Sequence, residues 1–145
     1  MKPAFSFGLG LLTMSVVAAG LAFSSAAEKP KAHRIVFHMT TPDTAAYRAL
    51  TKQITNVRKE WPTAQIEVVA HNKGISMLLK EKTNIQPQLT ELKAQGITFL
   101  ACENTLRQQK LEKSQIVGES GFVPGGLIHI VERQEEGWSY IKGGF

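Results

Sequence analysis

The stretch Ile97-Thr-Phe-Leu-Ala-Cys102-Glu103-Asn104-Thr105-Leu106 decides the fold of this 145-residue chain. A mostly apolar and partly β-branched run after Gly96 predicts a central strand that is covered on both faces. Asn104 is a good N-cap for a helix that begins directly after this strand. Cys102 is therefore expected at the carboxyl end of a sheet, beside the free N–H groups and the positive dipole end of a helix, where a thiolate is favoured.

The beginning of the chain has the features of a secretory signal peptide. Met1-Lys2 supplies a positive start, residues 5–23 are almost entirely apolar or small, and Ser24-Ser-Ala-Ala27 offers a cleavage site after Ala26 or Ala27. A permanent membrane anchor is the alternative. The preferred prediction is a signal peptide over residues 1–27, a single domain over residues 28–145, and a periplasmic or secreted protein with no stable membrane insertion.

Cys102 is the only cysteine of the chain. In an exported domain, which meets an oxidising compartment, a lone cysteine can be buried and inert, pair with another chain, or take part in chemistry. Its residue type alone favours burial. Its place at a strand end favours chemistry, so the alternatives stay open.

The net charge of +5 comes from basic residues that are spread along the sequence. Such a distribution is typical of a solvated surface rather than of a nucleic-acid interface, so no nucleic-acid partner is expected.

Hydrophobic periodicity predicts strands that alternate with helices, which is typical of a mostly parallel sheet with right-handed crossovers. Thr41 fits the N-cap of a helix whose first residue is Pro42 and whose apolar face ends at Trp61. Residues 126–136 fit either a strand, by their Leu-Ile-x-Ile-Val content, or one helical face closed by Gly137. The expected strands are residues 34–38, 65–70, 97–102, 121–123 and 138–141, and the other expected helices are a short one that holds Ile75, Leu78 and Leu79, one from Pro87 to Gly96, and residues 104–109.

Several motifs together resemble the DsrE/DsrF/TusD-type sulfur-relay family. They are Val68-Val-Ala-His71, Ala101-Cys102-x-Asn104-Thr105-Leu106, Val123-Pro-Gly-Gly and Gln134-Glu-Glu-Gly137-Trp-Ser-Tyr140-Ile141, and the match runs from about Arg34 to Ile141. The resemblance implies a flavodoxin-like three-layer α/β sandwich with a mostly parallel five-stranded sheet of order 2-1-3-4-5. It also favours the helix over residues 126–136. Glu103 departs from the family, which often has a small residue after the cysteine.

Three reactive side chains are expected along one rim of this sheet. Each of the first three strands ends in one of them: His38, His71 and Cys102. Ligands of such sheets bind at the carboxyl ends of the strands, near the switch point, which is expected here between the first and third strands. Asn104 and Glu103 form the helix start beside the cysteine, with the Glu103 carboxylate expected to turn outward. His71 is expected to assist Cys102 more than His38 does, because it leads the loop His71-Asn-Lys-Gly74 and the family has a histidine there.

Sulfur carriage is the preferred function, with Cys102 attacking sulfane sulfur and holding it as a persulfide. The alternatives are a nucleotide-binding module, a copper or zinc site, and a non-catalytic oligomeric protein. The loop over residues 39–44 has Pro42 and no glycine for a phosphate, and no compact ligand spacing supports a metal, so no cofactor and no metal are expected. A Ser-His-Asp hydrolase is not expected, because no Gly-x-Ser-x-Gly elbow occurs. The expected partners are copies of the same chain and a protein that gives or accepts sulfur.

Overall fold

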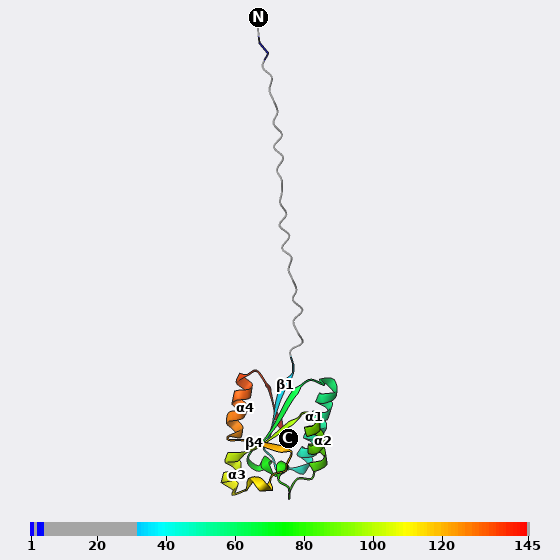
Figure 1. Ribbon diagram of the computed structural model, residues 1–145, viewed down its shortest axis with the longest axis vertical. Helices are drawn as coiled ribbons and strands as arrows, with labels where there is room; N and C mark the ends of the chain where they lie inside the picture. The colour runs from blue at the N-terminus through cyan, green and yellow to red at the C-terminus, as the bar shows by residue number, and fades with distance from the viewer. Residues whose placement is uncertain (2, 5–31, 145) are drawn as a thin grey trace.

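The structure, a computed structural model, describes Met1, Pro3, Ala4 and residues 32–144. The predicted signal peptide therefore lies almost entirely outside the described residues. The described domain is a five-stranded, all-parallel sheet with helices on both faces (Figure 1). Its elements are β1 (Arg34–Met39), α1 (Thr44–Glu60), β2 (Gln65–Ala70), the 3-10 helix η1 (Asn72–Leu78), α2 (Gln86–Ala94), β3 (Thr98–Cys102), α3 (Glu103–Gln109), the 3-10 helix η2 (Lys113–Gln115), β4 (Ser120–Val123), α4 (Gly126–Glu135) and β5 (Ser139–Gly143).

The predicted elements all form, including the helix over residues 126–136, but most of their ends differ from the prediction. The predicted N-cap at Thr41 is wrong, because the Asp43 carboxylate caps α1 by accepting the Ala45 N–H at 2.8 Å. Thr41 Oγ1 instead accepts the N–H of Asp43, so it orders the turn that leads to the cap. Trp61 lies beyond the end of α1 and is 38% exposed, whereas Leu50 and other members of the predicted apolar face are buried.

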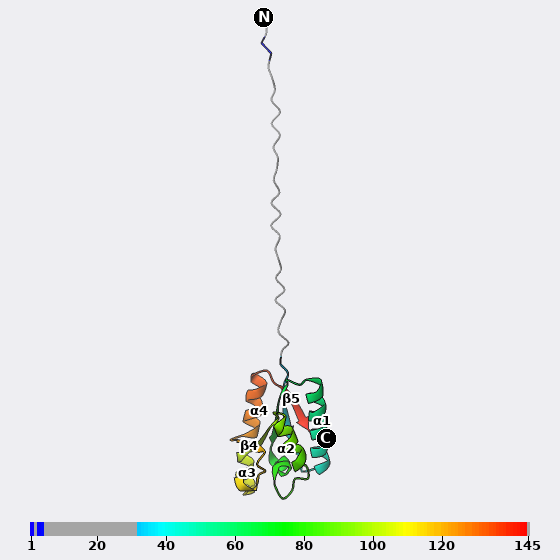
Figure 2. The same ribbon diagram turned by 45° about the vertical axis from the view of Figure 1, so that its right-hand side comes forward.

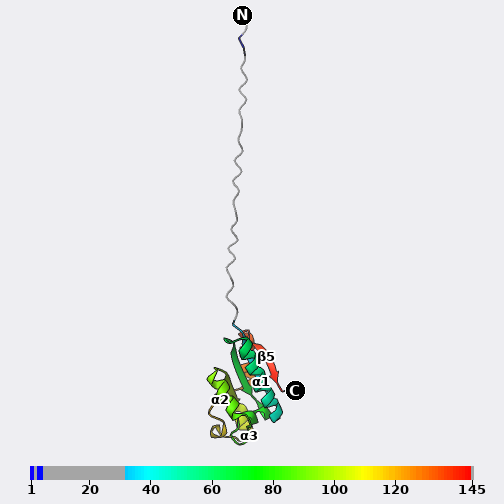
Figure 3. The ribbon, with the colours of Figure 1, turned by 90° about the vertical axis from the view of Figure 1, so that its right-hand side faces the viewer.

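Two hydrophobic cores lie on the two faces of the sheet. The larger core joins alternate strand residues such as Phe37 and Phe99 to α1 and α2, which cover one face (Figures 1 and 3). The smaller core joins the other strand residues to α4, and its buried members are Val36, Val69, Leu100, Val123 and Ile130. Because strand side chains alternate between faces, His38 and Cys102 share the α4 face with Val36 and Leu100.

The strand order is β4-β3-β2-β1-β5, so the predicted order 2-1-3-4-5 is wrong. β3 pairs with β2, with Ala70 opposite Ala101, and β5 pairs with the other side of β1. The physical reason is burial: β2 is buried at five of its six positions, while β5 is exposed at four of five and β4 is half-buried along most of its length. The two least apolar strands therefore take the edges. Figure 2 shows β5 between α4 and α1 in that view.

The predicted switch point between the first and third strands is also wrong, since β2 lies between them. The chain moves from β1 through β2 and β3 to β4, and α4 then carries it back across the other face to β5. β3 continues into α3, whose Leu106 joins the larger core, whereas the neighbouring strand β4 continues into α4 on the opposite face. Adjacent strands that lead to opposite faces open a crevice at their carboxyl ends. Cys102 lies at this crevice.

Candidate functional site

Cys102 is both the last residue of β3 and the N-cap of α3. The prediction that Asn104 is the N-cap is wrong, because the chain passes from the extended conformation at Cys102 directly into a helix that begins at Glu103. Asn104 is the second helical residue. Its side-chain oxygen accepts from Arg107, and its N–H donates to Pro124 O at 3.2 Å, which ties α3 to the connection between β4 and α4.

Several hydrogen-bond donors converge on the Cys102 sulfur. The N–H of Gly126, the first residue of α4, donates to Sγ at 3.2 Å. The Thr105 hydroxyl and the N–H groups of Thr105 and Asn104 act on the same sulfur from the first turn of α3. The N-termini of two helices therefore meet at one thiol, and their free N–H groups favour its anion.

Thr105 is oriented by a contact with the preceding loop. The N–H of Asn72 donates to Thr105 Oγ1 at 3.0 Å. Because a hydroxyl has one proton and accepts through its lone pairs, this contact leaves the Thr105 proton free to point at the sulfur. Asn72 reaches this position with a left-handed backbone, at φ 52°, which is uncommon for a residue other than glycine.

Two opposing effects set the pKa of Cys102. Burial raises the pKa of the thiol, because it disfavours the charged form. The hydrogen bonds from Thr105, Gly126 and Asn104 lower the pKa and outweigh burial, so the net pKa lies below its ordinary value. The site therefore favours a thiolate although the residue is buried.

The approach of α4 to the cysteine requires glycine. A methyl group on Gly126 would lie 3.2 Å from both Cys102 Cβ and Val69 Cγ1, and 3.5 Å from Sγ. Cys102 itself is 1% exposed. A reagent that is to reach the sulfur must therefore displace the start of α4 or the first turn of α3.

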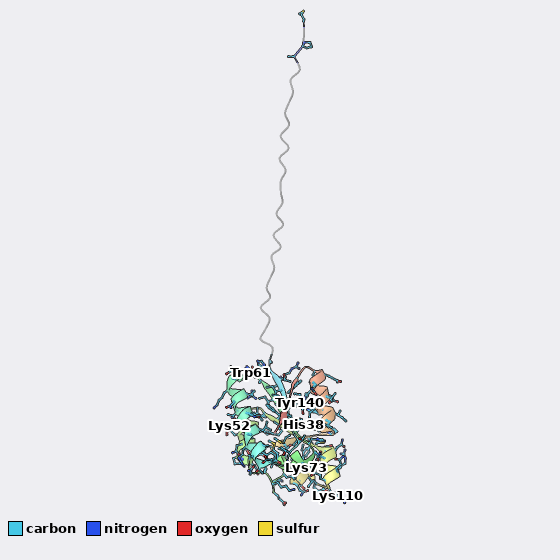
Figure 4. All side chains as sticks on the ribbon, turned by 180° about the vertical axis from the view of Figure 1, so that it is seen from behind. His38, Lys52, Trp61, Lys73, Lys110 and Tyr140 are labelled. Carbon is cyan, nitrogen blue, oxygen red and sulfur yellow. The ribbon has the colours of Figure 1, made fainter. Side chains whose placement is uncertain are left out.

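His38 and His71 lie side by side at the ends of neighbouring strands. Their ring centres are 5.5 Å apart, and His38 Nδ1 lies 3.3 Å from the Tyr140 hydroxyl oxygen (Figure 4 shows His38 beside Tyr140). His71 follows β2 in an extended conformation, so its side chain continues the alternation of β2 toward the α4 face. His38 Nε2 and His71 Nδ1 are buried, and within the described part of the chain they have no hydrogen-bond partner.

Both imidazoles are poor proton acceptors in this setting. Burial lowers the pKa of His38, and the nearby charges of His71 and Lys142 lower it further. Burial also lowers the pKa of His71. Among the hydrogen bonds of residues 32–144, the donors at the Cys102 sulfur come from the backbone and Thr105 rather than from either ring. The sheet thus brings the side chains of His38, His71 and Cys102 to one rim and one face. The groups that polarise the Cys102 thiol, however, come from the N-termini of α3 and α4 rather than from the imidazoles.

Glu103 lies in the first turn of α3 and its carboxylate forms an ion pair with Lys113. Lys113 Nζ also lies 4.8 Å from the centre of the Phe122 ring. The pKa of Cys102 is shifted by its hydrogen-bond donors and by burial, with no contribution from Glu103 among its causes.

Sequence reasoning missed two residues of this site, Thr105 and Gly126. Thr105 stands three residues after the cysteine, where a side chain of the first helical turn can reach back to the N-cap residue. Gly126 belongs to the motif Val123-Pro-Gly-Gly, in which paired glycines precede an apolar helical face. The closeness of Gly126 to Cys102 comes from the pairing of β3 with β4, which sets Val123 opposite Cys102.

Within residues 32–144, no group of three or more His, Cys, Asp and Glu side chains is placed to hold a metal ion. The same part of the chain contains no helix that is both long and apolar enough to cross a membrane.

The fold and the site define a class of small three-layer α/β proteins that present one cysteine between two helix starts at the carboxyl end of a parallel sheet. The chain belongs to the DsrE/DsrF-like family, which it matches over residues 18–142. A comparison with curated proteins gave no significant match.

Solved structures agree with this assignment. The chain is similar to a protein of unknown function from Methanobacterium thermoautotrophicum, with 34% identity, a TM-score of 0.72 and coverage of 76% of this chain and 98% of that one. The ychN protein from E. coli shares the fold at 10% identity, with a TM-score of 0.63 and coverage of 77% and 98%. A conserved protein of unknown function from Bacteroides thetaiotaomicron does so at 15% identity, with a TM-score of 0.60 and coverage of 75% and 93%.

Proposed function

We propose that this protein is an exported sulfur carrier that holds sulfur as a persulfide on Cys102. The observation that carries the proposal is the set of donors around Sγ, from Gly126, Thr105 and Asn104, which lower the pKa of a buried thiol. The thiolate is the nucleophilic form of cysteine, and a persulfide anion needs the same kind of stabilisation. Family membership is compatible with a sulfur-relay role.

The chemistry needs only the thiolate and a sulfane donor. The Cys102 thiolate attacks a sulfane sulfur, the bond between that sulfur and its leaving group breaks, and the leaving group departs with the electron pair. The product is a Cys102 persulfide anion. In the second half of the cycle, an acceptor thiolate attacks the outer sulfur of the persulfide and regenerates the Cys102 thiolate.

The histidines fit a supporting role. We expect His71 to contribute more than His38, because His71 follows the strand that pairs directly with β3, whereas His38 lies one strand further away and contacts Tyr140. The lowered pKa keeps the imidazole neutral, and a neutral imidazole can orient an incoming sulfur donor or acceptor through a hydrogen bond.

Export and self-association belong to the same proposal. Residues 1–27 have the composition of a cleaved signal peptide, so we place the mature protein in the periplasm or outside the cell. We propose a homo-oligomer because the outer side of α4 exposes Leu127, Ile128 and Val131, and because α4 begins at the thiol. Apolar side chains gathered on one exposed surface are typical of an interaction site.

Intact mass after exposure to polysulfide tests the carrier function. We expect the mature wild type to gain about 32 Da per sulfur, reversibly by reductant. Cys102→Ser should gain nothing, and His71→Ala should gain sulfur more slowly than His38→Ala. If the wild type gains no sulfur, or Cys102→Ser gains as much, Cys102 is a structural residue and the proposal is wrong.

A further inference from the structure

The carboxyl end of the sheet carries exposed positive charge. Lys73 lies in η1 directly after β2, Arg107 and Lys110 lie at the end of α3, and Lys142 lies in β5 opposite His38. All four are exposed, and within residues 32–144 none of them forms a salt bridge. We call these four residues the basic rim. Figure 4 shows Lys73 and Lys110 at one end of the domain and Trp61 at the other.

Three acids near this end are already engaged, and a fourth, the exposed Glu81, lies between Lys80 and Lys82 in the sequence. Asp43 accepts the Ala45 N–H as the cap of α1, Glu103 pairs with Lys113, and Glu112 caps η2. At the opposite end of the molecule, α1 ends in Glu60 and α4 in Glu135, both exposed. That end also carries Arg34, Arg58 and Lys59, so its charges are mixed, whereas the four cations of the basic rim lie together at the Cys102 end.

The positive charge acts on the reactive rim itself. Lys142 lies opposite His38 in the sheet and is one of the groups that lower the pKa of His38, so its charge reaches that imidazole. A cavity of about 500 Å³ also opens beside α3, and its charged lining residues are Arg107, Lys110, Lys113, Glu103 and Glu112. Lys113 is paired with Glu103, so Arg107 and Lys110 are the cations that can attract a small anion there.

We infer that Cys102 takes its sulfur from a small anionic donor, of the class of thiosulfate and polysulfides, which the basic rim attracts to the carboxyl end of the sheet. The inference rests on the proposed carrier function and adds the charge and size of the donor. Small size follows from the burial of Cys102, since only a small molecule reaches a 1% exposed residue through a local opening of the α3 and α4 starts.

The transfer from thiosulfate balances without another reagent. The Cys102 thiolate attacks the sulfane sulfur, a new S–S bond forms, and the S–S bond of thiosulfate breaks with the electron pair leaving on sulfite. One negative charge on the thiolate and two on thiosulfate become one on the persulfide and two on sulfite. The anionic reactant and the anionic leaving group are both stabilised by the basic rim.

Alkylation of Cys102 in the mature protein by iodoacetate and by iodoacetamide isolates the effect of charge, because the two reagents perform the same substitution and differ by one carboxylate. The quantity compared is the rate of alkylation by iodoacetate divided by the rate of alkylation by iodoacetamide, at 0.01 M salt. We expect this ratio to be about tenfold lower in the double variant Lys73→Glu/Lys110→Glu than in the wild type, which is the low end of the effects of electrostatic steering. The double variant Lys52→Glu/Lys59→Glu has the same net charge and should keep the wild-type ratio. At 1 M salt, where the screening length is about 3 Å, the proteins should agree. Equal ratios in both double variants at low salt would overturn the inference.

Binding of thiosulfate to Cys102→Ser separates this inference from the carrier function. We expect saturable amide chemical-shift changes centred on residues 72–74 and 103–110, weakened by salt and lost with Lys73→Glu/Lys110→Glu. Absence of these changes would overturn the inference even if wild-type Cys102 gains sulfur from polysulfide. Binding of thiosulfate by a protein whose wild-type cysteine never gains sulfur would support the anion site and overturn the carrier function.

Discussion

At the scale of single residues, the chemistry of Cys102 depends on whether hydrogen bonds or burial have the larger effect on the pKa of its thiol. A cysteine in an apolar core keeps its proton, because burial disfavours the thiolate. Here the sulfur is as buried as a core residue, yet it receives an N–H from Gly126 and a hydroxyl proton from Thr105. The Asn72 N–H donates to the same Thr105 oxygen, which leaves the hydroxyl proton free to point at the sulfur.

Gly126→Ala should weaken both packing and thiolate formation. The added methyl would meet Cys102 Cβ and Val69 Cγ1 at 3.2 Å, on two central strands that cannot move aside. We expect a loss of about 1 kcal/mol in the free energy of unfolding, the low end of overpacking costs, because alanine's helix propensity offsets part of the strain. Urea unfolding measures the loss.

Gly125→Ala is the matched control for this prediction. Its methyl would meet mainly the Cδ1 of Ile128, the end of an exposed side chain that can turn away. Equal stability of the two variants would show that the close approach of Gly126 to the cysteine is unimportant.

At the scale of elements, α4 is fixed to the sheet by a charged cluster far from the cysteine. Glu67 of β2 is 8% exposed, and its carboxylate accepts from Arg133 Nε and Nη2, each at 2.9 Å, and lies 2.7 Å from His129 Nε2. Burial raises the pKa of Glu67, but the hydrogen bonds from Arg133 and His129 outweigh it, so the net pKa is lowered. His129 and Arg133 both lie in α4, so this cluster ties the helix that begins at Gly126 to β2.

Glu67→Gln should destabilise the protein by about 3 kcal/mol at pH 7, the low end for breaking a buried ion pair. A carboxylate whose pKa is lowered by folding adds stability above its ordinary pKa of about 4.5, and that stability is lost as the pH falls through the folded-state value. The difference between wild type and variant should therefore shrink below pH 4.5. Urea unfolding at several pH values measures it.

Glu132→Gln, on the exposed side of the same helix, is the control and should change stability little. A difference between wild type and Glu67→Gln that stays constant from pH 7 to pH 3 would contradict the proposed role of the ionised carboxylate.

The elements were predictable where local signals decide them. β2 has the predicted bounds because turn signals flank its apolar run, and the helix over residues 126–136 required the family resemblance because its sequence fits two periods. The strand order was not predictable, since it depends on which strands can leave a face exposed. The sequence of β5 alone does not show that it takes an edge, because this depends on how its apolar content compares with that of the other strands. The rim of His38, His71 and Cys102 followed from strand ends. Thr105 reaches the sulfur from the first turn of α3, which begins one residue earlier than predicted, and Gly126 reaches it through a tertiary contact.

At the scale of the whole molecule, the described domain has one end with exposed cations, an opposite end where α1 and α4 finish in acids, and one helix with an exposed apolar side. α4 connects these features, because it begins at the thiol and exposes Leu127, Ile128 and Val131 along its length. Self-association through α4 would bring a second subunit close to the start of the helix.

The double variant Leu127→Glu/Val131→Glu should dissociate the proposed oligomer, because each charge would be buried without a partner at the interface. Light scattering of the mature protein at micromolar concentration is expected to show an oligomer for the wild type and a monomer for the variant. Gln134→Glu, an exposed change on the same helix, should remain oligomeric. A monomeric wild type would remove the oligomer from the proposed function.

The most direct measurement of the central claim is the ionisation of Cys102, followed by thiolate absorbance near 240 nm as the pH is raised, with Cys102→Ser subtracted. The expected midpoint lies below the value of about 8.5 for an unperturbed thiol. It should move upward in Thr105→Val, which removes the hydroxyl donor, and stay near the wild-type value in Thr105→Ser. A wild-type midpoint at or above 8.5, unmoved by Thr105→Val, would show that burial prevails and that Cys102 is a structural cysteine.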